Sequence, residues 1–581
     1  MRTADVVRPT MPPPRVASLR REGIVVFLVA AVLLAPGLTW GIPHATGPQL
    51  IRGWDVDGVG GVAVLAELSN LLHAPPRGWY VAYPVFHYLL QGAAYAPYVA
   101  YLFLTGGLAS PSPAYPFGLA DPVGSIWVLH FITRVIAVCM AAGVVALGFA
   151  MVRRRAPLGN ALVAALAVLV TEPLVFYAHT GNLDVPVLFW SVLTVYLITD
   201  PVENLGWRRA AAIGAAAGLA VATKDQAYAV VSPALLWFAF RQWKGTTPPD
   251  AAAGAQTSLR RRLTPVAVAA AASLIIFLVA GGAITWPHRF AMHVRYLLNY
   301  EVSFANLRHP TFLTVLRPST FMGLLALAGD LAKALREALG LPLALLGAAA
   351  FVASARRSPL VRVLAWSSLG CFVFSIVPIH HLQYRYALFP AFALAVTVGV
   401  ALPHAANGMS RRLWLAVVAV ALVYRGSFTV DLVYQQVRDA RYAAGDWAIA
   451  HMQPGDEVAY FGGTHQLPHL PQGVQPIWLY GEDTLAVKAV AERQFRWIVV
   501  AADYFSADSR DHSSIMPDSV WTSLTSGRNG YRQAAMFATS SLTGYSPYYL
   551  PYVNPPVRIF ERTAPPTTPR RLSRRGEAPP F

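Results

Sequence analysis

Two closely spaced carboxylates, Asp55 and Asp57, stand out in a chain that is poor in acidic residues. They come directly before an apolar stretch, 59–72, and a third carboxylate, Asp184, comes directly before another. Carboxylates gathered in one place can act as a general base on a hydroxyl or as ligands for a hard divalent cation. The local alternative is helix capping, by Asp57 before 59–72 and by Asp184, which has Pro186 just inside the following helix.

Three basic residues complement these carboxylates. Arg134 interrupts an apolar stretch, where it either faces a partner or cavity or snorkels to the surface. Lys224 lies in a tight turn beside Asp225, with which it could form a local ion pair. Arg385 lies among tyrosines, a setting typical of an interfacial anchor. Guanidinium groups also suit phosphate oxygens, so these cations fit a phosphate-bearing lipid.

The elements that position these residues must lie in a membrane. The chain has 581 residues, of which 55% are hydrophobic and only 13% charged, whereas an ordinary soluble domain carries about 25% charged residues. Aromatic residues make up 12% of the chain and the glycines show no regular period, which excludes disordered and collagen-like proteins. Cys139 and Cys371 both lie in apolar runs, so we expect neither a disulfide nor a cysteine metal site.

Eleven apolar stretches predict membrane-spanning helices. They lie near 24–40, 125–151, 158–177, 185–199, 210–223, 226–240, 264–286, 341–355, 360–378, 386–402 and 412–428. With the N-terminus inside, the inner segments before residue 424 hold about twice as many Lys and Arg residues as the outer ones. The net charge of +17 is therefore interpreted as a topology signal, and we expect no nucleic-acid partner.

This topology predicts an α-helical polytopic membrane protein with a small C-terminal α/β domain outside the membrane. The predicted parts are a cytoplasmic segment 1–23, a transmembrane domain 24–428, an extracytoplasmic α/β domain 429–563 and a disordered tail 564–581. Two long outer loops, about 41–124 and 287–340, alternate apolar stretches with Pro/Gly breaks, which predicts helices along the membrane surface. The outer domain is predicted as helix 434–451, strand 457–462, helix 484–494 and strand 496–502.

Familiar signatures of other membrane proteins are missing from the sequence. It contains no G-x-x-x-x-G-K-[ST], H-E-x-x-H or G-x-S-x-G motif, which argues against ATP-driven transport and the common membrane hydrolases. A transporter or lipid-linked-sugar flippase without catalysis would explain the spans and Arg134. It would not explain a long first outer loop with D-x-D or a C-terminal outer domain. An inactive scaffold is a third alternative.

The order of these features resembles the GT-C superfamily of polyprenyl-phosphate-sugar glycosyltransferases, especially its protein O-mannosyltransferase and lipid A aminoarabinose transferase branch. In that family an Asp-Glu motif follows the first span, and Asp55-Val56 or Asp57-Gly58 occupies this place. The other matching motifs, over about 20–430, are Tyr83-Pro84-Val85-Phe86-His87-Tyr88, Thr133-Arg134-Val135, Asp184-Val185-Pro186, Ala222-Thr223-Lys224 and Tyr384-Arg385-Tyr386-Ala387-Leu388-Phe389-Pro390. Gly58 stands where the family has Glu, so the motif does not decide between Asp55 and Asp57.

The resemblance implies transfer of a hexose or pentose, with inversion, from an undecaprenyl- or decaprenyl-type phosphate carrier. The acceptor would be a hydroxyl of an envelope glycan, lipid or protein on the outer side of a bacterial plasma membrane. Asp57, or Asp55, would be the catalytic base, with Asp57 favoured by the register of the following helix. The donor phosphate would be bound by Arg134, Lys224 and Arg385.

The resemblance also suggests further site residues. Asp184 would orient the acceptor or a cation, and Glu67 falls roughly where some relatives keep another acid, with a solvated helical residue as the alternative. Further candidates for substrate contacts are Tyr83, His87, His179 and Tyr384. The superfamily has metal-dependent and metal-independent members, so a divalent cation is optional. Its ligands would be Asp55, Asp57 and Asp184.

Overall fold

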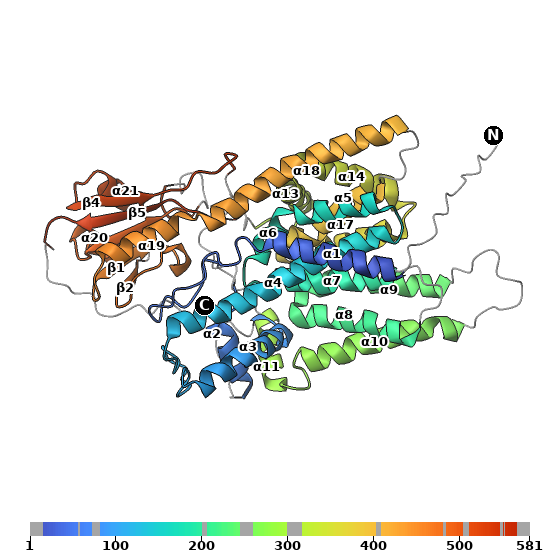
Figure 1. Cartoon of the computed structure of the whole chain (residues 1–581), viewed down its shortest axis with the longest axis horizontal. Helices are drawn as coiled ribbons and strands as arrows, with labels where there is room; N and C mark the ends of the chain where they lie inside the picture. The colour runs from blue at the N-terminus through green and yellow to red at the C-terminus, as the bar shows by residue number, and fades with distance from the viewer. Residues whose placement is uncertain are drawn as a thin grey trace, which may run out of the picture.

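The protein consists of a helical bundle and a small sheet domain at one end of it, as the computed structural model shows (Figure 1). The structure describes residues 16–55, 58–72, 82–199, 206–244, 259–298, 316–401, 408–479, 484–503, 511–545, 550 and 552–565. The predicted tail beyond residue 565 lies outside these stretches. The mostly helical architecture with a small C-terminal sheet domain is therefore confirmed.

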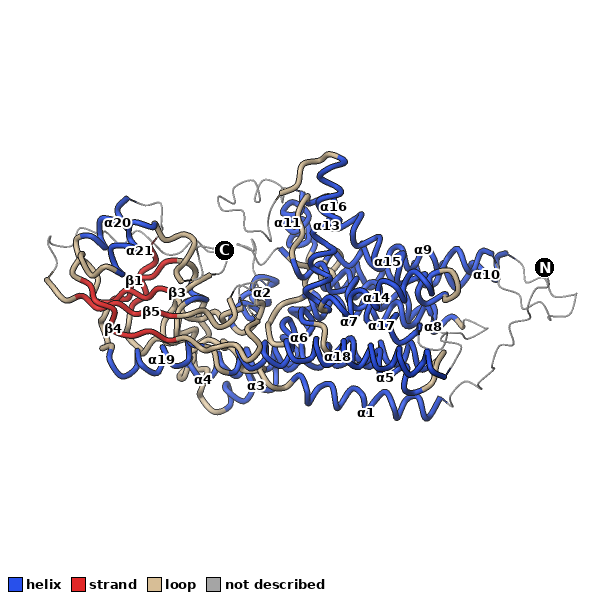
Figure 2. Tube along the Cα trace, turned by 90° about the horizontal axis from the view of Figure 1, so that it is seen from above, coloured by secondary structure: helices blue, strands red, loops and turns tan. Residues whose placement is uncertain are grey.

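Most bundle helices run along the long axis of the molecule (Figures 1 and 2). They are α1 (Val16–Leu34), α4 (Pro122–Arg153), α5 (Leu158–Leu169), α6 (Glu172–Ala178), α7 (Asp184–Thr199), α8 (Trp207–Thr223), α9 (Tyr228–Lys244), α10 (Leu259–Ala280), α14 (Leu341–Ala355), α15 (Pro359–Cys371), α16 (Val377–Ile379), α17 (Leu388–Ala401) and α18 (Gly408–Val437). Small residues let them approach closely. A Cβ on Gly214 of α8 would lie 2.0 Å from the Ala269 carbonyl oxygen of α10.

Each predicted span overlaps one of these helices, but several ends differ. The first helix stops at Leu34 rather than residue 40, because Pro36 and Gly37, with φ +93°, cannot continue it. Helix α10 stops at Ala280 rather than 286, where two glycines follow. The span predicted over 158–177 is bent by 63° between α5 and α6.

Among the described residues, fewer helices than the eleven predicted spans are long and apolar enough to cross a membrane. Five helices of the described chain are long and apolar enough to cross a membrane, or up to seven if each bent pair counts as one span. Helix α7, with 16 residues, is apolar but below that length. Several apolar helices are thus confirmed, and the count of eleven stays a prediction.

Four further helices occupy the two predicted outer loops. They are α2 (Val62–Leu72), α3 (Phe86–Leu104), α11 (Pro287–Leu298) and α13 (Phe321–Leu339). Helix α2 lies between α3 and α11 (Figure 2). It begins at Val62 rather than 59, because Gly61 adopts φ +56° directly before it. Asp57, which was predicted to cap this helix, lies outside the described residues.

The long helix α18 leads from the bundle to α19 (Ala440–His451) and the sheet domain (Figure 1). The sheet contains β1 (Glu457–Phe461), β2 (Gln475–Leu479), β3 (Trp497–Ala501), β4 (Tyr531–Phe537) and β5 (Val557–Arg562), in the order β2-β1-β3-β5-β4. The first three strands are parallel, and β5 is antiparallel to β3 and β4. Sequence patterns missed β2, β4 and β5. Pro476 fits β2 because this strand lies at the sheet edge.

Helices cover both faces of the sheet. On one face α19 packs on inward side chains such as Tyr460 and Val499. On the other face α20 (Thr484–Ala491) and α21 (Asp518–Thr525) pack on the alternate residues, such as Phe461 and Val500. The predicted helices and strands at α19, β1, α20 and β3 are confirmed.

The junction of α18 and α19 holds the segment that follows α1. Trp40 Nε1 donates to Asp439 Oδ2 at 3.0 Å, and Arg441 Nη2 donates to the same oxygen at 2.7 Å. The Arg441 guanidinium also stacks on Trp54, 3.9 Å from the ring centroid. These contacts fix Trp54, the neighbour of Asp55, against the outer domain.

Candidate active site

Asp55 and Arg134 form a buried ion pair between α4 and the segment after α1. Arg134 Nη2 lies 3.0 Å from Asp55 Oδ1, and the two side chains are 0% and 5% exposed. The other carboxylate oxygen, Oδ2, accepts the Gly181 N–H at 2.8 Å, and Arg134 also donates to the Trp40 carbonyl oxygen. Arg134 thus has a partner in the protein interior and does not snorkel to the surface.

Gly58 is required by this arrangement. A Cβ at residue 58 would lie 2.1 Å from Asp55 Oδ2, and the Gly58 N–H donates to the Asp55 carbonyl at 3.1 Å. The Asp55 carboxylate cannot move aside, because Arg134 and Gly181 hold both of its oxygens. A glycine where the resembling family has Glu therefore has a steric reason in this chain.

Replacing Gly58 by Ala should destabilise the protein by about 1–3 kcal/mol, the usual cost of forcing a methyl group into a packed site. Thermal unfolding of the purified variant in detergent measures this effect. Gly159→Ala is the matched control, because a Cβ there meets nothing within 4 Å. Equal unfolding temperatures for the two variants would contradict the packing of Gly58 on Asp55.

Asp184, Lys224 and Arg385 form a second charged centre. Lys224 Nζ lies 2.6 Å from Asp184 Oδ1, and Arg385 Nη1 lies 4.0 Å from Asp184 Oδ2. All three side chains are buried or nearly so, at 5%, 4% and 11% exposure. We call these three residues the cationic triad, because two cations share one carboxylate.

Short turns place each member of the triad. Asp184 opens α7, and its N–H donates to Asn182 Oδ1 at 2.7 Å, so Asn182 rather than Asp184 supplies the capping side chain. Lys224 follows the last residue of α8 in extended conformation. Arg385 lies in a 3₁₀ turn, Tyr384–Ala387, before α17. The Tyr83 ring lies 5.6 Å from Lys224 Nζ, which places this predicted contact residue beside the triad.

The loop before α7 joins the two charged centres. Its Gly181 N–H binds Asp55, its Gly181 carbonyl accepts the Val59 N–H at 3.0 Å, and three residues later Asp184 binds Lys224. The acidic segment after α1 and the cationic triad are therefore held by one short loop. The structure brings together Asp55, Arg134, Asp184, Lys224 and Arg385 in this way.

The alternative of a local Lys224–Asp225 pair is wrong. Asp225 instead accepts from His293 Nε2 of α11 at 3.1 Å, because the turn after α8 points Lys224 toward α7.

A neighbouring contact was missed from the sequence: Arg289 Nε of α11 lies 2.6 Å from Glu67 Oε1 of α2. Glu67 is fully buried, not solvated, and burial raises its pKa while Arg289 opposes that shift. The sequence did offer a signal for this pair, because an acidic residue such as Glu67 inside an apolar helix is costly to bury without a basic partner.

Two of the remaining predicted contact residues, His179 and Tyr384, have partners within the protein, whereas His87 Nδ1 has no hydrogen-bond partner among the described residues. His179 is buried, with Nδ1 2.7 Å from Gln436 Oε1 and Nε2 2.8 Å from the Leu34 carbonyl. The Tyr384 hydroxyl donates to Glu172 at 3.1 Å, beside the Arg425–Glu172 pair. His87 is buried on α3, and burial lowers its pKa to about 3. These contacts support positioning roles for His179 and Tyr384.

The described carboxylates do not fit a divalent-cation site. Asp55 and Asp184 are each neutralised by basic side chains within 4.0 Å. Within the described stretches no group of three or more His, Cys, Asp or Glu side chains could hold a metal ion. Asp57, the third predicted ligand of the optional cation, lies outside the described residues.

A comparison with known protein families supports the resemblance predicted from the sequence. Residues 124–249, which include Arg134, Asp184 and Lys224, match the family model described as dolichyl-phosphate-mannose-protein mannosyltransferase. The resemblance to GT-C glycosyltransferases is confirmed. A search of curated proteins gave no match.

Several solved structures are similar to this GT-C-like chain at low identity. ArnT from Cupriavidus metallidurans bound to undecaprenyl phosphate is 15% identical, with TM-score 0.47, and covers 92% of this chain and 97% of its own. The Archaeoglobus fulgidus oligosaccharyltransferase AglB, in complex with an inhibitory peptide and a dolichol-phosphate, is 12% identical, with TM-score 0.43, over 86% of this chain and 72% of its own. The Saccharomyces cerevisiae Pmt1-Pmt2 complex bound to the sugar donor is 17% identical, with TM-score 0.29, over 49% and 36%.

Proposed function

We propose that this protein is a membrane glycosyltransferase that moves a sugar from a polyprenyl-phosphate donor of undecaprenyl or decaprenyl type. The acceptor is a hydroxyl group on the extracytoplasmic side, and the anomeric centre is inverted. The observation that carries the proposal is the cationic triad. Two of its members, Asp184 and Lys224, lie within residues 124–249, which match the family model described as dolichyl-phosphate-mannose-protein mannosyltransferase.

The triad suits a lipid phosphate. Lys224 and Arg385 are two buried or nearly buried cations that lie on one carboxylate, Asp184. A phosphate beside them could accept hydrogen bonds from both cations. As the sugar leaves, negative charge grows on the phosphate oxygen, and the same cations stabilise it.

Asp57 is the base in this proposal. Both oxygens of Asp55 are already bound, by Arg134 and by the Gly181 N–H, so Asp55 is poorly placed to take up a proton. Its role is to hold the segment after α1 against α4 and the loop before α7. Asp57, two residues later, takes the proton of the acceptor hydroxyl while that oxygen attacks the anomeric carbon. The bond to the phosphate oxygen breaks on the opposite face.

The location follows from charge and hydropathy. Apolar helices indicate a membrane protein, and the basic inner segments support a cytoplasmic N-terminus in a bacterial plasma membrane. The sheet domain then lies outside, near the acceptor glycan, lipid or protein of the envelope. A hexose and a pentose are both compatible with these contacts.

Neutralising Arg385 tests the phosphate site directly. Arg385→Gln should weaken binding of undecaprenyl phosphate at least about tenfold, because a hydrogen bond to a charged group is worth about 1.5–3 kcal/mol. Ligand-induced thermal stabilisation of the purified protein measures the affinity. Arg532→Gln, on an exposed strand of the sheet domain, is the control and should bind like the unmodified protein. Equal binding by both variants would contradict the phosphate site.

A further inference from the structure

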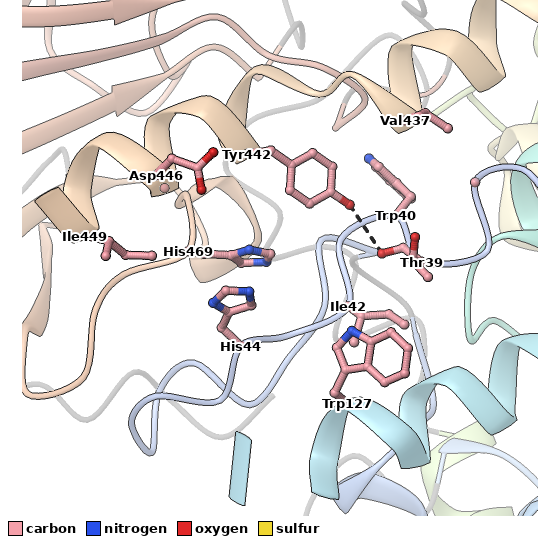
Figure 3. Close-up of a pocket in the computed structure, with 12 residues that line it drawn as sticks. Thr39, Trp40, Ile42, His44, Trp127, Val437, Tyr442, Asp446, Ile449 and His469 are labelled. Atoms are coloured by element: carbon pink, nitrogen blue, oxygen red, sulfur yellow. Dashed lines mark hydrogen bonds between the residues drawn. The ribbon is translucent and has the colours of Figure 1, made fainter. Parts of the chain in front are cut away.

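A second site lies beside the outer domain, away from the cationic triad. It is a pocket of about 460 Å³ between the segment after α1, the start of α4 and the α18–α19 junction (Figure 3). Thr39, Trp40 and His44 line one wall, Tyr442 and Asp446 of α19 another, and Trp127 of α4 a third. Its volume is typical of a small-molecule site. Among the described residues that line it, none belongs to the triad.

Stacked rings build one side of this pocket. His44 lies on His469 with ring centroids 3.7 Å apart, and His469 lies on Trp54 at 4.9 Å. The Arg441 guanidinium also lies over the Trp54 ring, 3.9 Å from its centroid. Burial lowers the pKa of His44, and burial with nearby His44 and Arg441 lowers the pKa of His469 to about 3. Both imidazoles are therefore neutral at pH 7.

The pocket wall offers groups that suit sugar hydroxyls. A neutral imidazole presents one donor and one acceptor, and both His44 and His469 line the pocket. Asp446 is an exposed carboxylate on the rim that can accept from two hydroxyls. Trp127 is 37% exposed and presents an aromatic surface to the pocket. Neutral donors and acceptors, a carboxylate and an aromatic face favour a polyhydroxylated ring over a phosphate.

A short contact path leads from the pocket to the acidic segment. Trp40 lines the pocket, and its carbonyl oxygen accepts from Arg134, which binds Asp55. The Tyr442 hydroxyl accepts the Gly41 N–H at 3.0 Å and lies 3.3 Å from the Thr39 carbonyl (Figure 3). A ligand in the pocket therefore touches the same segment that carries Asp55 and Asp57.

We propose that this pocket binds one sugar unit of a glycan acceptor, with Asp446, His469 and Trp127 as its contacts. The inference rests on the proposed function and narrows its acceptor to a glycan. The donor phosphate is assigned to the triad, and no member of the triad lines this pocket, so the pocket is assigned to the acceptor. The acceptor chain extends from this subsite toward the segment that carries the base.

Saturation-transfer NMR on the full-length protein in nanodiscs tests the subsite. The probes are the methyl glycosides of mannose, glucose, galactose and arabinose, in both anomeric forms. At least one of them should bind, and Asp446→Asn and Trp127→Ala should each weaken that binding about tenfold, or about 1.4 kcal/mol. The matched controls are Asp518→Asn and Trp243→Ala, which alter residues outside the pocket and should bind like the unmodified protein.

The outcomes separate this inference from the proposed function. Absence of binding by every glycoside, or equal binding in pocket variants and controls, would overturn the subsite. Asp57→Asn should still bind the glycoside, because it changes neither Asp446 nor Trp127. Failure of sugar transfer with intact glycoside binding would instead count against the catalytic assignment. Thermal unfolding of each pocket variant establishes that a loss of binding does not arise from misfolding.

Discussion

Asp57→Asn should reduce sugar transfer by about 10²–10⁴-fold, the usual contribution of a general base. The amide cannot take up the acceptor proton, while its size and shape match the carboxylate. The measurement is turnover of a labelled polyprenyl-phosphate sugar by the purified protein. The unfolding temperature, measured in parallel, separates loss of the base from loss of the fold.

Asp55→Asn is the matched variant two residues away, and a different result is expected for it. It breaks the buried pair with Arg134 and leaves that guanidinium without its counter-charge, which costs about 3–5 kcal/mol. Transfer and thermal stability should therefore fall together. If Asp55→Asn lost turnover at unchanged stability while Asp57→Asn kept it, the roles of the two carboxylates would have to be exchanged.

Lys224→Met should lower kcat/KM by about 10²–10³-fold, because it removes a cation that stabilises the departing phosphate. Among the described residues, Asp184 then keeps one basic neighbour, Arg385, whose closest nitrogen is 4.0 Å away, so the variant should be less stable. Lys224→Arg retains the charge and should recover part of the activity. Steady-state kinetics with varied donor, together with thermal unfolding, separates the two effects.

Lys333→Met provides the control for Lys224. Lys333 pairs with Asp330 at 3.7 Å, but its side chain is 64% exposed, so its loss should alter neither stability nor kinetics measurably. Equal donor kinetics in Lys224→Met and Lys333→Met would contradict the assignment of the cationic triad to the donor phosphate.

Hydropathy predicted where the helices lie, because burial in lipid demands long apolar stretches. It could not predict where they break. The bend between α5 and α6 and the early end of α1 depend on particular residues such as Pro36 and Gly37. Strands β4 and β5 were missed because charged and polar side chains such as Arg532, Gln533 and Arg558 interrupt their apolar residues, and β4 lies at the sheet edge.

The sequence predicted which residues belong to the candidate site, but not which of them contact one another. Arg134 and the few carboxylates could be chosen from the sequence, because a charged side chain in an apolar segment is energetically costly and is therefore a functional candidate. Their partners depend on tertiary contacts: Gly181 on Asp55, Lys224 on Asp184, and Arg289 on the unexpected Glu67. The pocket around His44 and His469 joins segments more than 400 residues apart, which no local pattern could show.

Sugar transfer by the purified protein in liposomes is the most direct test of the account. The liposomes would contain a labelled polyprenyl-phosphate hexose or pentose, and envelope glycan, lipid and protein fractions would be supplied outside. Label should move to an acceptor with inverted configuration, and Asp57→Asn should reduce this transfer by about 10²–10⁴-fold. Movement of the labelled lipid across the bilayer without transfer to any fraction would contradict this prediction and favour a flippase.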